Sequence, residues 1–110
     1  MKLNLKYTKI DPSNAVAEYV TQKIEDLSDL INVSDSEMNG GGATVEAWVE
    51  VGRTTEHHNK GDVFFAEGQI RLPGDQEIRA ESIQPELHLA IDDMKDELQV
   101  QLKKYKEKQM

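Results

Sequence analysis

The sequence predicts an α+β domain of two layers, in which a four-stranded sheet carries two helices on one face. The apolar residues alternate between a period of two, which is typical of strands, and spacings of three and four, which are typical of amphipathic helices. Each predicted strand has one apolar face and each predicted helix has one apolar stripe. Because such elements bury their apolar sides against each other, both helices are expected to cover one side of the sheet and leave the other side open.

The chain begins with a predicted strand and a predicted helix. The strand is indicated by the alternating residues Leu3, Leu5 and Tyr7. The apolar stripe of the helix comprises Val16, Tyr19, Val20, Ile24, Leu27 and Ile31. Asp11 and Pro12 are expected to supply the N-cap and a first-turn proline, with Ser13 as the alternative cap.

Residues 32–43 show no periodic pattern and contain three consecutive glycines, so we expect a flexible connection there. The second strand turns its apolar residues inward, namely Val45, Ala47, Val49 and Val51. Its polar face includes Trp48. The inward residues of the third strand are Phe64, Ala66, Gly68, Ile70 and Leu72. Val63 and Phe65 alternate with these residues and are expected to face the open side.

Pro73 and Gly74 are the residues typical of a type II turn, which predicts a hairpin into a fourth strand through Ile78 and Ala80. A long helix then begins near Pro85. Its apolar stripe comprises Leu87, Ile91, Met94, Leu98, Leu102 and Tyr105. The predicted order is therefore β-α-β-β-β-α, which resembles double-stranded-RNA-binding folds in outline.

A chain of 110 residues has the size of one compact domain, so residues 1–110 are expected to form a single unit. The chain contains no cysteine, which suits a reducing compartment. Its first ten residues alternate polar and apolar types, unlike the apolar core of a signal peptide, and no stretch approaches the ~20 apolar residues of a membrane span. These features predict a cytoplasmic protein with no membrane partner.

The formal net charge of −8 argues against indiscriminate nucleic-acid binding, because contacts to phosphate depend on Lys and Arg. One segment departs from this balance. Residues 103–108, KKYKEK, hold four lysines and one glutamate, which makes them locally +3. Because charges are screened over about 8 Å at physiological salt, this basic cluster can act despite the acidic total.

Two groups of residues invite a chemical interpretation. His57, His58 and Asp62 are zinc-ligand types, but adjacent residues of an extended chain point apart and the helical His-x-x-x-His spacing is absent, so a polar loop is preferred. Asp92 and Asp93 with Asp96 and Glu97 look like paired carboxylates, but they lie in the first half of the last helix, where the helix dipole favours acids, and we interpret them as a solvated face. We therefore expect no enzyme activity, no metal and no cofactor.

Four stretches carry a resemblance to a known family: HHNKGDVFFAEGQIRLPG, IRAES, ELHLAIDDMKDELQVQLKKYKEK and, for the first helix, SNAVAEYVTQKI. Together they resemble the ribosome hibernation promoting factors, also called ribosomal subunit interface or sigma-54 modulation proteins. The resemblance covers nearly the whole chain except residues 32–43 and agrees with the predicted order of elements. The chain stops after KYKEKQM, without the linker and second domain of the long members, as expected for a short form.

The resemblance implies a non-enzymatic factor that binds the small ribosomal subunit in the channel for messenger and transfer RNA. Such a factor would silence translation under stress by steric occlusion. It requires Lys and Arg side chains on the helices and the adjoining loop to meet ribosomal-RNA phosphates. The candidate RNA-binding residues are Lys23, Arg53, Lys60, Arg79, Lys103, Lys104 and Lys106.

The chain also departs from the family where its members usually carry basic residues. Those positions hold Ala17, Asp26, Glu56, Phe65 and Val100, and His88 replaces a common tyrosine. The departures support an alternative: a divergent acidic member with weak or no ribosome binding that acts as a protein-interaction module, or as a homodimer through the open sheet face. The candidate interface residues for this alternative are Trp48, Val63, Phe65 and Val100.

Overall fold

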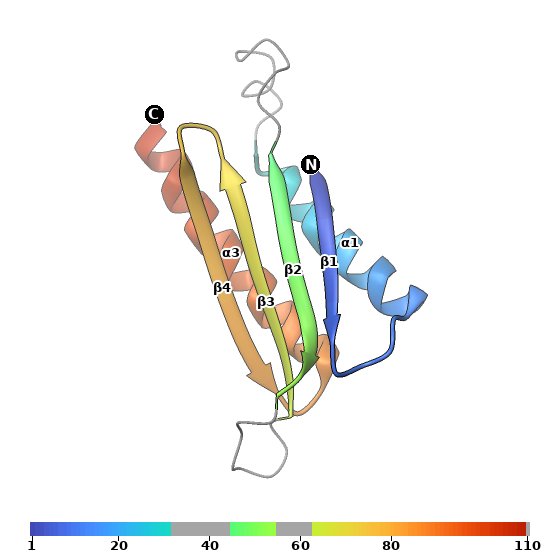
Figure 1. Ribbon diagram of the computed structural model, residues 1–110. Helices are drawn as coiled ribbons and strands as arrows, with labels where there is room; N and C mark the ends of the chain where they lie inside the picture. The colour runs from blue at the N-terminus through green and yellow to red at the C-terminus, as the bar shows by residue number, and fades with distance from the viewer. Residues whose placement is uncertain (32–44, 55–62, 110) are drawn as a thin grey trace.

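A computed structural model of the protein describes residues 1–31, 45–54 and 63–109 (Figure 1). The elements in chain order are β1 (Lys2–Thr8), α1 (Asn14–Ser28), β2 (Glu46–Arg53), β3 (Phe64–Leu72), β4 (Gln76–Gln84) and α3 (Leu87–Gln109). The order β-α-β-β-β-α predicted from periodicity is therefore confirmed within the described residues. Residues 32–43 and the histidine loop fall outside these residues, so the predictions made for them do too.

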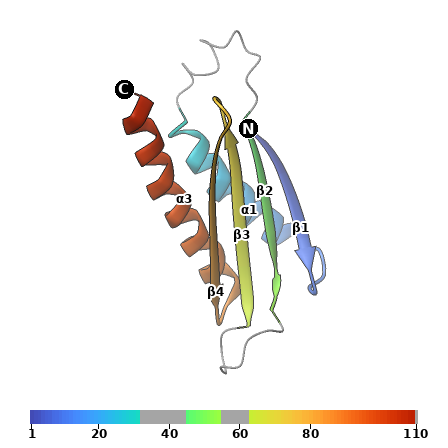
Figure 2. The same ribbon diagram turned by 60° about the vertical axis from the view of Figure 1, so that its left-hand side comes forward.

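The four strands form one sheet in the order β1-β2-β3-β4, with β1 parallel to β2 and the other neighbours antiparallel. Figures 1 and 2 show both helices on the same side of this sheet, α1 behind β1 and β2 and α3 behind β3 and β4. The other side carries no helix from the described residues. The predicted two-layer α+β class, with one covered and one open face, is confirmed.

The core lies between the sheet and the helices and follows the predicted alternation. Ala66, Gly68, Ile70 and Leu72 are buried, whereas Phe64 at the start of β3 is only half-buried. The helices contribute the stripes that their spacing predicts, and their fully buried members are Val20, Leu27, Ile91, Met94, Leu98 and Leu102. Burial of these side chains, at roughly 1.5–3 kcal/mol each, is the main term that holds the two layers together.

The N-cap of α1 is Ser13, so the expectation that Asp11 would cap the helix and Pro12 would occupy its first turn is wrong. Ser13 has extended backbone, with φ −142° and ψ 128°, and its Oγ accepts a hydrogen bond from the Val16 N–H at 3.3 Å. The hydroxyl thereby satisfies one N–H that the first helical turn leaves without a partner. The helix ends at Ser28, so Ile31 is buried but lies beyond it.

The hairpin between β3 and β4 turns on Gly74, whose φ of 81° fits the positive value that a type II turn requires at its third position. Asp75 also has a positive φ, 59°, so the loop contains residues 73–75, and Leu72 is paired with Gln76. The hydroxyl of Tyr105 donates a hydrogen bond to the Pro73 carbonyl at 3.3 Å. This contact fixes the C-terminal part of α3 beside the hairpin.

The outer edge of β4 is covered at its midpoint by a side chain of α3. The Nε2 of Gln101 donates to the Arg79 carbonyl at 2.7 Å, and its Oε1 accepts from the Arg79 N–H at 3.2 Å. The amide thus makes the two hydrogen bonds that a further strand would make at this position. An edge strand with unpaired backbone groups invites pairing with another chain, and Gln101 removes one such opportunity.

Gly68 allows α3 to approach the sheet closely. A Cβ atom at this position would lie 2.5 Å from the Sδ of Met94 and 2.9 Å from a Cδ atom of Leu98, both of which are fully buried. These distances are shorter than van der Waals contact, so a larger residue forces the helix or its side chains to move.

Substitution Gly68→Ala is expected to lower the free energy of unfolding by about 1–3 kcal/mol, because the methyl group overpacks the contact between β3 and α3. Urea denaturation followed by circular dichroism measures the change. Gln69→Ala, on the open face of the same strand, is the matched control and should stay within about 0.5 kcal/mol of the wild type. Equal stability of the two variants would show that the contact is not tight.

Candidate functional site

The predicted RNA-binding residues do not form one surface. Lys103, Lys104 and Lys106 lie together on the last turns of α3. Arg53 ends β2, at the opposite end of the sheet from the β3–β4 hairpin (Figure 1). The remaining candidates are Lys23 between the helices, Arg79 on the open face and Lys60 outside the described residues.

The end of α3 is the part of the described chain where cationic side chains gather without carboxylate partners. Lys103, Lys104 and Lys108 are exposed and Lys106 is half-buried, and the structure records no ion pair for any of these four within the described residues. Lys106 and Lys108 belong to the last helical turn, where the helix dipole stabilises positive charge. Lys108 was not among the predicted residues, although the run KKYKEK contains it. We call these four lysines the α3 lysine cluster.

Lys23 is held between the two helices by one carboxylate and one aromatic ring. Its Nζ lies 3.3 Å from an Oδ atom of Asp92 and 5.1 Å from the centroid of the Tyr19 ring. The same Oδ atom accepts a hydrogen bond from the Tyr19 hydroxyl at 2.5 Å. Tyr19 and Lys23 are neighbours on one helix face because they are four residues apart. Asp92 comes from α3, so the network also ties the helices together.

The network shifts the pKa of each of its members. The hydrogen bond to Asp92 raises the pKa of the Tyr19 hydroxyl, and the contact with Asp92 likewise raises the pKa of the Lys23 ammonium. Partial burial acts to raise the pKa of the Asp92 carboxyl, but the hydrogen bonds from Tyr19 and Lys23, together with the positive charge of Lys23, lower it below its ordinary value. All three shifts favour a neutral tyrosine, a charged lysine and a charged carboxylate at neutral pH.

The prediction of a solvated face holds for Asp93, Asp96 and Glu97, which are exposed, but is wrong for Asp92, which is half-buried. The helix dipole does not explain the positions of these acidic residues. The first turn of α3 contains no acidic residue, and the dipole effect falls off within that turn. Asp92 and Asp93 also have specific partners on other elements. Asp93 accepts hydrogen bonds from the Ser82 hydroxyl and from the Gln84 amide of β4, as Asp92 does from α1.

The outer surface of the helix layer is acidic up to the middle of α3. Helix α1 contains three carboxylates and one lysine, and residues 87–99 of α3 contain four carboxylates and one lysine. Seven negative charges against two positive charges give these segments a formal charge of −5. Asp26, at a position where the family resemblance led us to expect a basic residue, is exposed and adds to this surface. The positive end of α3 therefore adjoins a negative surface on the same helix.

Arg79 and Arg53 also have partners. An Nη atom of Arg79 lies 2.8 Å from the Oε1 of Glu67 on the neighbouring strand, so its charge is neutralised on the open face. The Arg53 guanidinium lies over the Phe64 ring, 5.1 Å from its centroid, and retains its exposed position at the strand end.

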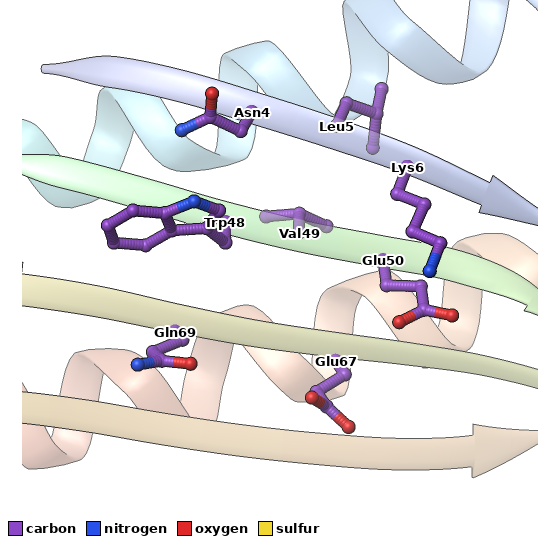
Figure 3. Close-up of a pocket in the computed structure, with 8 residues that line it drawn as sticks. All are labelled: Asn4, Leu5, Lys6, Trp48, Val49, Glu50, Glu67 and Gln69. Atoms are coloured by element: carbon purple, nitrogen blue, oxygen red, sulfur yellow. The ribbon is translucent and has the colours of Figure 1, made fainter.

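The open face of the sheet is organised as rows of paired polar side chains. Figure 3 shows one row formed by Asn4, Trp48 and Gln69, and a second row formed by Lys6, Glu50 and Glu67. The two rows enclose a depression of about 220 Å³. Ion pairs on this face join Lys2 to Glu46, Arg71 to Glu77 and Arg79 to Glu67.

The predicted interface residues are likewise spread over the molecule. Trp48 and Phe65 both face the open side, as expected. Phe65 pairs with Gly52, which lies four residues from Trp48 on β2, so the two side chains are separated by roughly 13 Å along the strands. The Arg71 guanidinium lies 5.2 Å from the Trp48 ring centroid and covers part of the indole. Val63 precedes β3, and Val100, 46% exposed, lies on α3 in the other layer.

Within the described ranges, no group of three or more His, Asp or Glu side chains is placed to hold a metal ion. None of the helices in those ranges combines the length and the apolar character needed to cross a membrane. His57, His58 and Asp62, which were weighed as ligands, lie outside them.

A two-layer β-α-β-β-β-α domain with one open sheet face is the class that the geometry defines. The sequence model of the family described as Sigma 54 modulation protein / S30EA ribosomal protein matches residues 3–110, and the chain belongs to this family. Members of the family are non-enzymatic ribosome-binding factors, in agreement with the prediction that the protein is not an enzyme.

Solved structures of other proteins share this fold. The N-terminal domain of Protein Y from Thermus thermophilus has 24% sequence identity and a TM-score of 0.72, with 96% of this chain and 99% of that chain covered. A ribosomal subunit interface protein from Coxiella burnetii has 21% identity and a TM-score of 0.68, with 96% and 98% covered. No curated protein sequence matches the chain.

The Tyr19–Lys23–Asp92 network predicts a pH dependence of stability. The pKa of Asp92 is lowered in the folded protein, so its contribution is present above the unfolded value near 3.8 and is lost as the pH falls through the lower folded value. The pKa values of Tyr19 and Lys23 are raised, so their contributions are lost only as the pH rises above 10.0 and 10.5.

Substitution Asp92→Asn is therefore expected to lower the free energy of unfolding by about 0.5–1 kcal/mol between pH 5 and 9, because it removes the ion pair but keeps an acceptor for Tyr19. Urea denaturation of both proteins across this range, extended down to pH 2.5, measures the difference. The difference should shrink below about pH 4. A difference that instead grows in acid would contradict the assigned shift of Asp92.

Proposed function

We propose that the protein binds the small ribosomal subunit in the channel for messenger and transfer RNA and silences translation under stress by steric occlusion. Membership of a family of ribosome-binding factors supports the ribosome as partner. The folds of Protein Y from Thermus thermophilus and of a ribosomal subunit interface protein from Coxiella burnetii support the same assignment. Such a protein acts in the cytoplasm, where ribosomes are.

The α3 lysine cluster is the observation that carries this proposal for the chain itself. Its four ammonium groups lie within two turns of one rigid helix and have no carboxylate partner within the described residues. Unpaired lysines can bind phosphate oxygens of RNA. Each such contact favours binding because it releases condensed counterions from the RNA. The packing of Tyr105 against the β3–β4 hairpin keeps the cluster in place.

The distribution of charge also predicts how this chain binds. Segments of formal charge −5 on the helix layer would repel RNA phosphates, so close contact is favourable mainly at the end of α3. A contact made by about four lysines gives a slope of roughly −3 in a plot of log affinity against log salt concentration. A domain placed in the channel excludes messenger and transfer RNA by its volume. Steric exclusion of this kind requires few contacts with the ribosome.

The double substitution Lys103→Glu with Lys106→Glu should weaken co-sedimentation with purified bacterial small ribosomal subunits at least ten-fold at 50 mM salt. It should also lower the magnitude of the salt slope by about 2, because two phosphate contacts are lost. Lys2→Glu with Lys6→Glu is the matched control, since it changes the net charge equally but lies on the open face. An equal loss of affinity in both double variants would show that the α3 lysine cluster does not bind the ribosome.

The alternative, a protein-interaction module that dimerises through the open sheet face, is favoured by one observation. Trp48, Phe65 and the 39%-exposed Ile83 place apolar surface on a face whose ion pairs are already satisfied. A face of paired charges loses less solvation on contact than one with free charges.

The two functions are separated by the oligomeric state and by ribosome binding. Analytical ultracentrifugation of the wild type is expected to give a monomer, and Trp48→Asp is expected to leave its sedimentation unchanged. A dimer that Trp48→Asp dissociates, together with absence of co-sedimentation at low salt, would establish the interaction module instead.

A further inference from the structure

One carboxylate in the helix layer is placed to control which cations reach RNA. Asp92 binds Lys23 at 3.3 Å, and the side chain of Lys23 is only 28% exposed in this position. We propose that Asp92 acts as an internal competitor for Lys23, withdraws it from RNA and thereby confines the RNA-binding surface to the end of α3. This inference rests on the proposed function, because it concerns the affinity of that same surface.

The contacts around Lys23 oppose its release. The ammonium has an ion pair with Asp92 and a cation–π contact with Tyr19, and the Tyr19 hydroxyl holds the carboxylate in place from the other helix. A lysine that moved to a phosphate would give up both contacts. It would also leave the Asp92 carboxylate uncompensated beside the phosphate, and like charges repel. Lys103 and Lys104 are exposed and meet neither obstacle.

The effect is specific to Asp92 and is not a consequence of net charge alone. Asp93 is the next residue on the same helix, but its carboxylate accepts hydrogen bonds from Ser82 and Gln84. The structure records no ion pair for Asp93 within the described residues. Glu67 does neutralise a cation, Arg79, but on the open face, away from the helix layer. Removal of the negative charge at each of these three positions would therefore free a different cation, or none.

Three single substitutions that each remove one negative charge separate these cases: Asp92→Asn, Asp93→Asn and Glu67→Gln. Asp92→Asn frees Lys23 beside the helices, Asp93→Asn frees no recorded ion-pair partner, and Glu67→Gln frees Arg79 on the opposite face. Asn at position 92 still accepts the hydrogen bond from Tyr19, so the contact between the helices persists. Thermal unfolding of each variant verifies that the domain remains folded under the binding conditions.

Affinity for purified bacterial small ribosomal subunits, measured between 50 and 500 mM salt, is the readout. Asp92→Asn should bind about ten-fold more tightly than the wild type at 50 mM salt and increase the magnitude of the salt slope by about 0.7–0.9, the effect of one added phosphate contact. Asp93→Asn and Glu67→Gln should show a smaller gain and an unchanged slope. Equal gains for Asp92→Asn and Asp93→Asn would overturn the inference, and a larger gain for Glu67→Gln would move the RNA contact to the open face.

A double variant tests whether Lys23 is the residue released. Adding Lys23→Gln to Asp92→Asn should abolish the gain and return the slope to the wild-type value. A gain that persists without Lys23 would refute the role assigned to Asp92.

The behaviour of the wild type distinguishes this inference from the proposed function. Binding by the wild type with no difference among the single variants overturns the inference alone. If Asp92→Asn binds and the wild type does not, the inference is supported, and the proposal that the wild-type protein binds the ribosome is overturned. Absence of binding by every protein overturns both.

Discussion

Burial of one face of the sheet under α1 and α3 sets both the core and the exposed surfaces of the protein. Because side chains alternate along a strand, this burial sends Ala66, Gly68 and Ile70 into the core and Glu67 and Gln69 to the open face. It also fixes the distance between the helices. Two helices packed on one sheet lie close enough for a carboxylate on α3 to reach a tyrosine and a lysine on α1.

The packing therefore decides the electrostatics of the surface. An acidic chain folds so that Lys23, Arg71 and Arg79 each meet a carboxylate on a neighbouring element. Exposed ion pairs of this kind add little to stability, about 0–1 kcal/mol each, but they reduce the charge available to a partner. Within the described residues the α3 lysine cluster has no recorded ion pair. Glu107 is the one carboxylate inside the cluster, and the other acidic residues of α3 lie at positions 92–97. The family fold thus carries a cluster of unpaired lysines at one end of α3.

Much of the fold followed from local patterns, whereas little of the site did. Periodicity placed the strands and both helices correctly, because a residue's face depends only on its position along its own element. The N-cap was expected at Asp11 with Ser13 as the alternative, since several residue types can cap a helix, and the extended backbone at Ser13 decides for the alternative. The contact between Lys23 and Tyr19 had a signal in their spacing of four. The third member, Asp92, had none, because it lies 73 residues from Tyr19 in the sequence.

The order of the elements, the apolar face of each, the family resemblance and the basic run at residues 103–108 could all be read from the sequence. Each of these is encoded in neighbouring residues. Only the tertiary structure decided which cations remain available, separating Arg53 from the α3 lysine cluster and neutralising Lys23 and Arg79. The reason is that an ion pair requires side chains from different elements within about 4 Å, and that distance is set by how helices and strands pack.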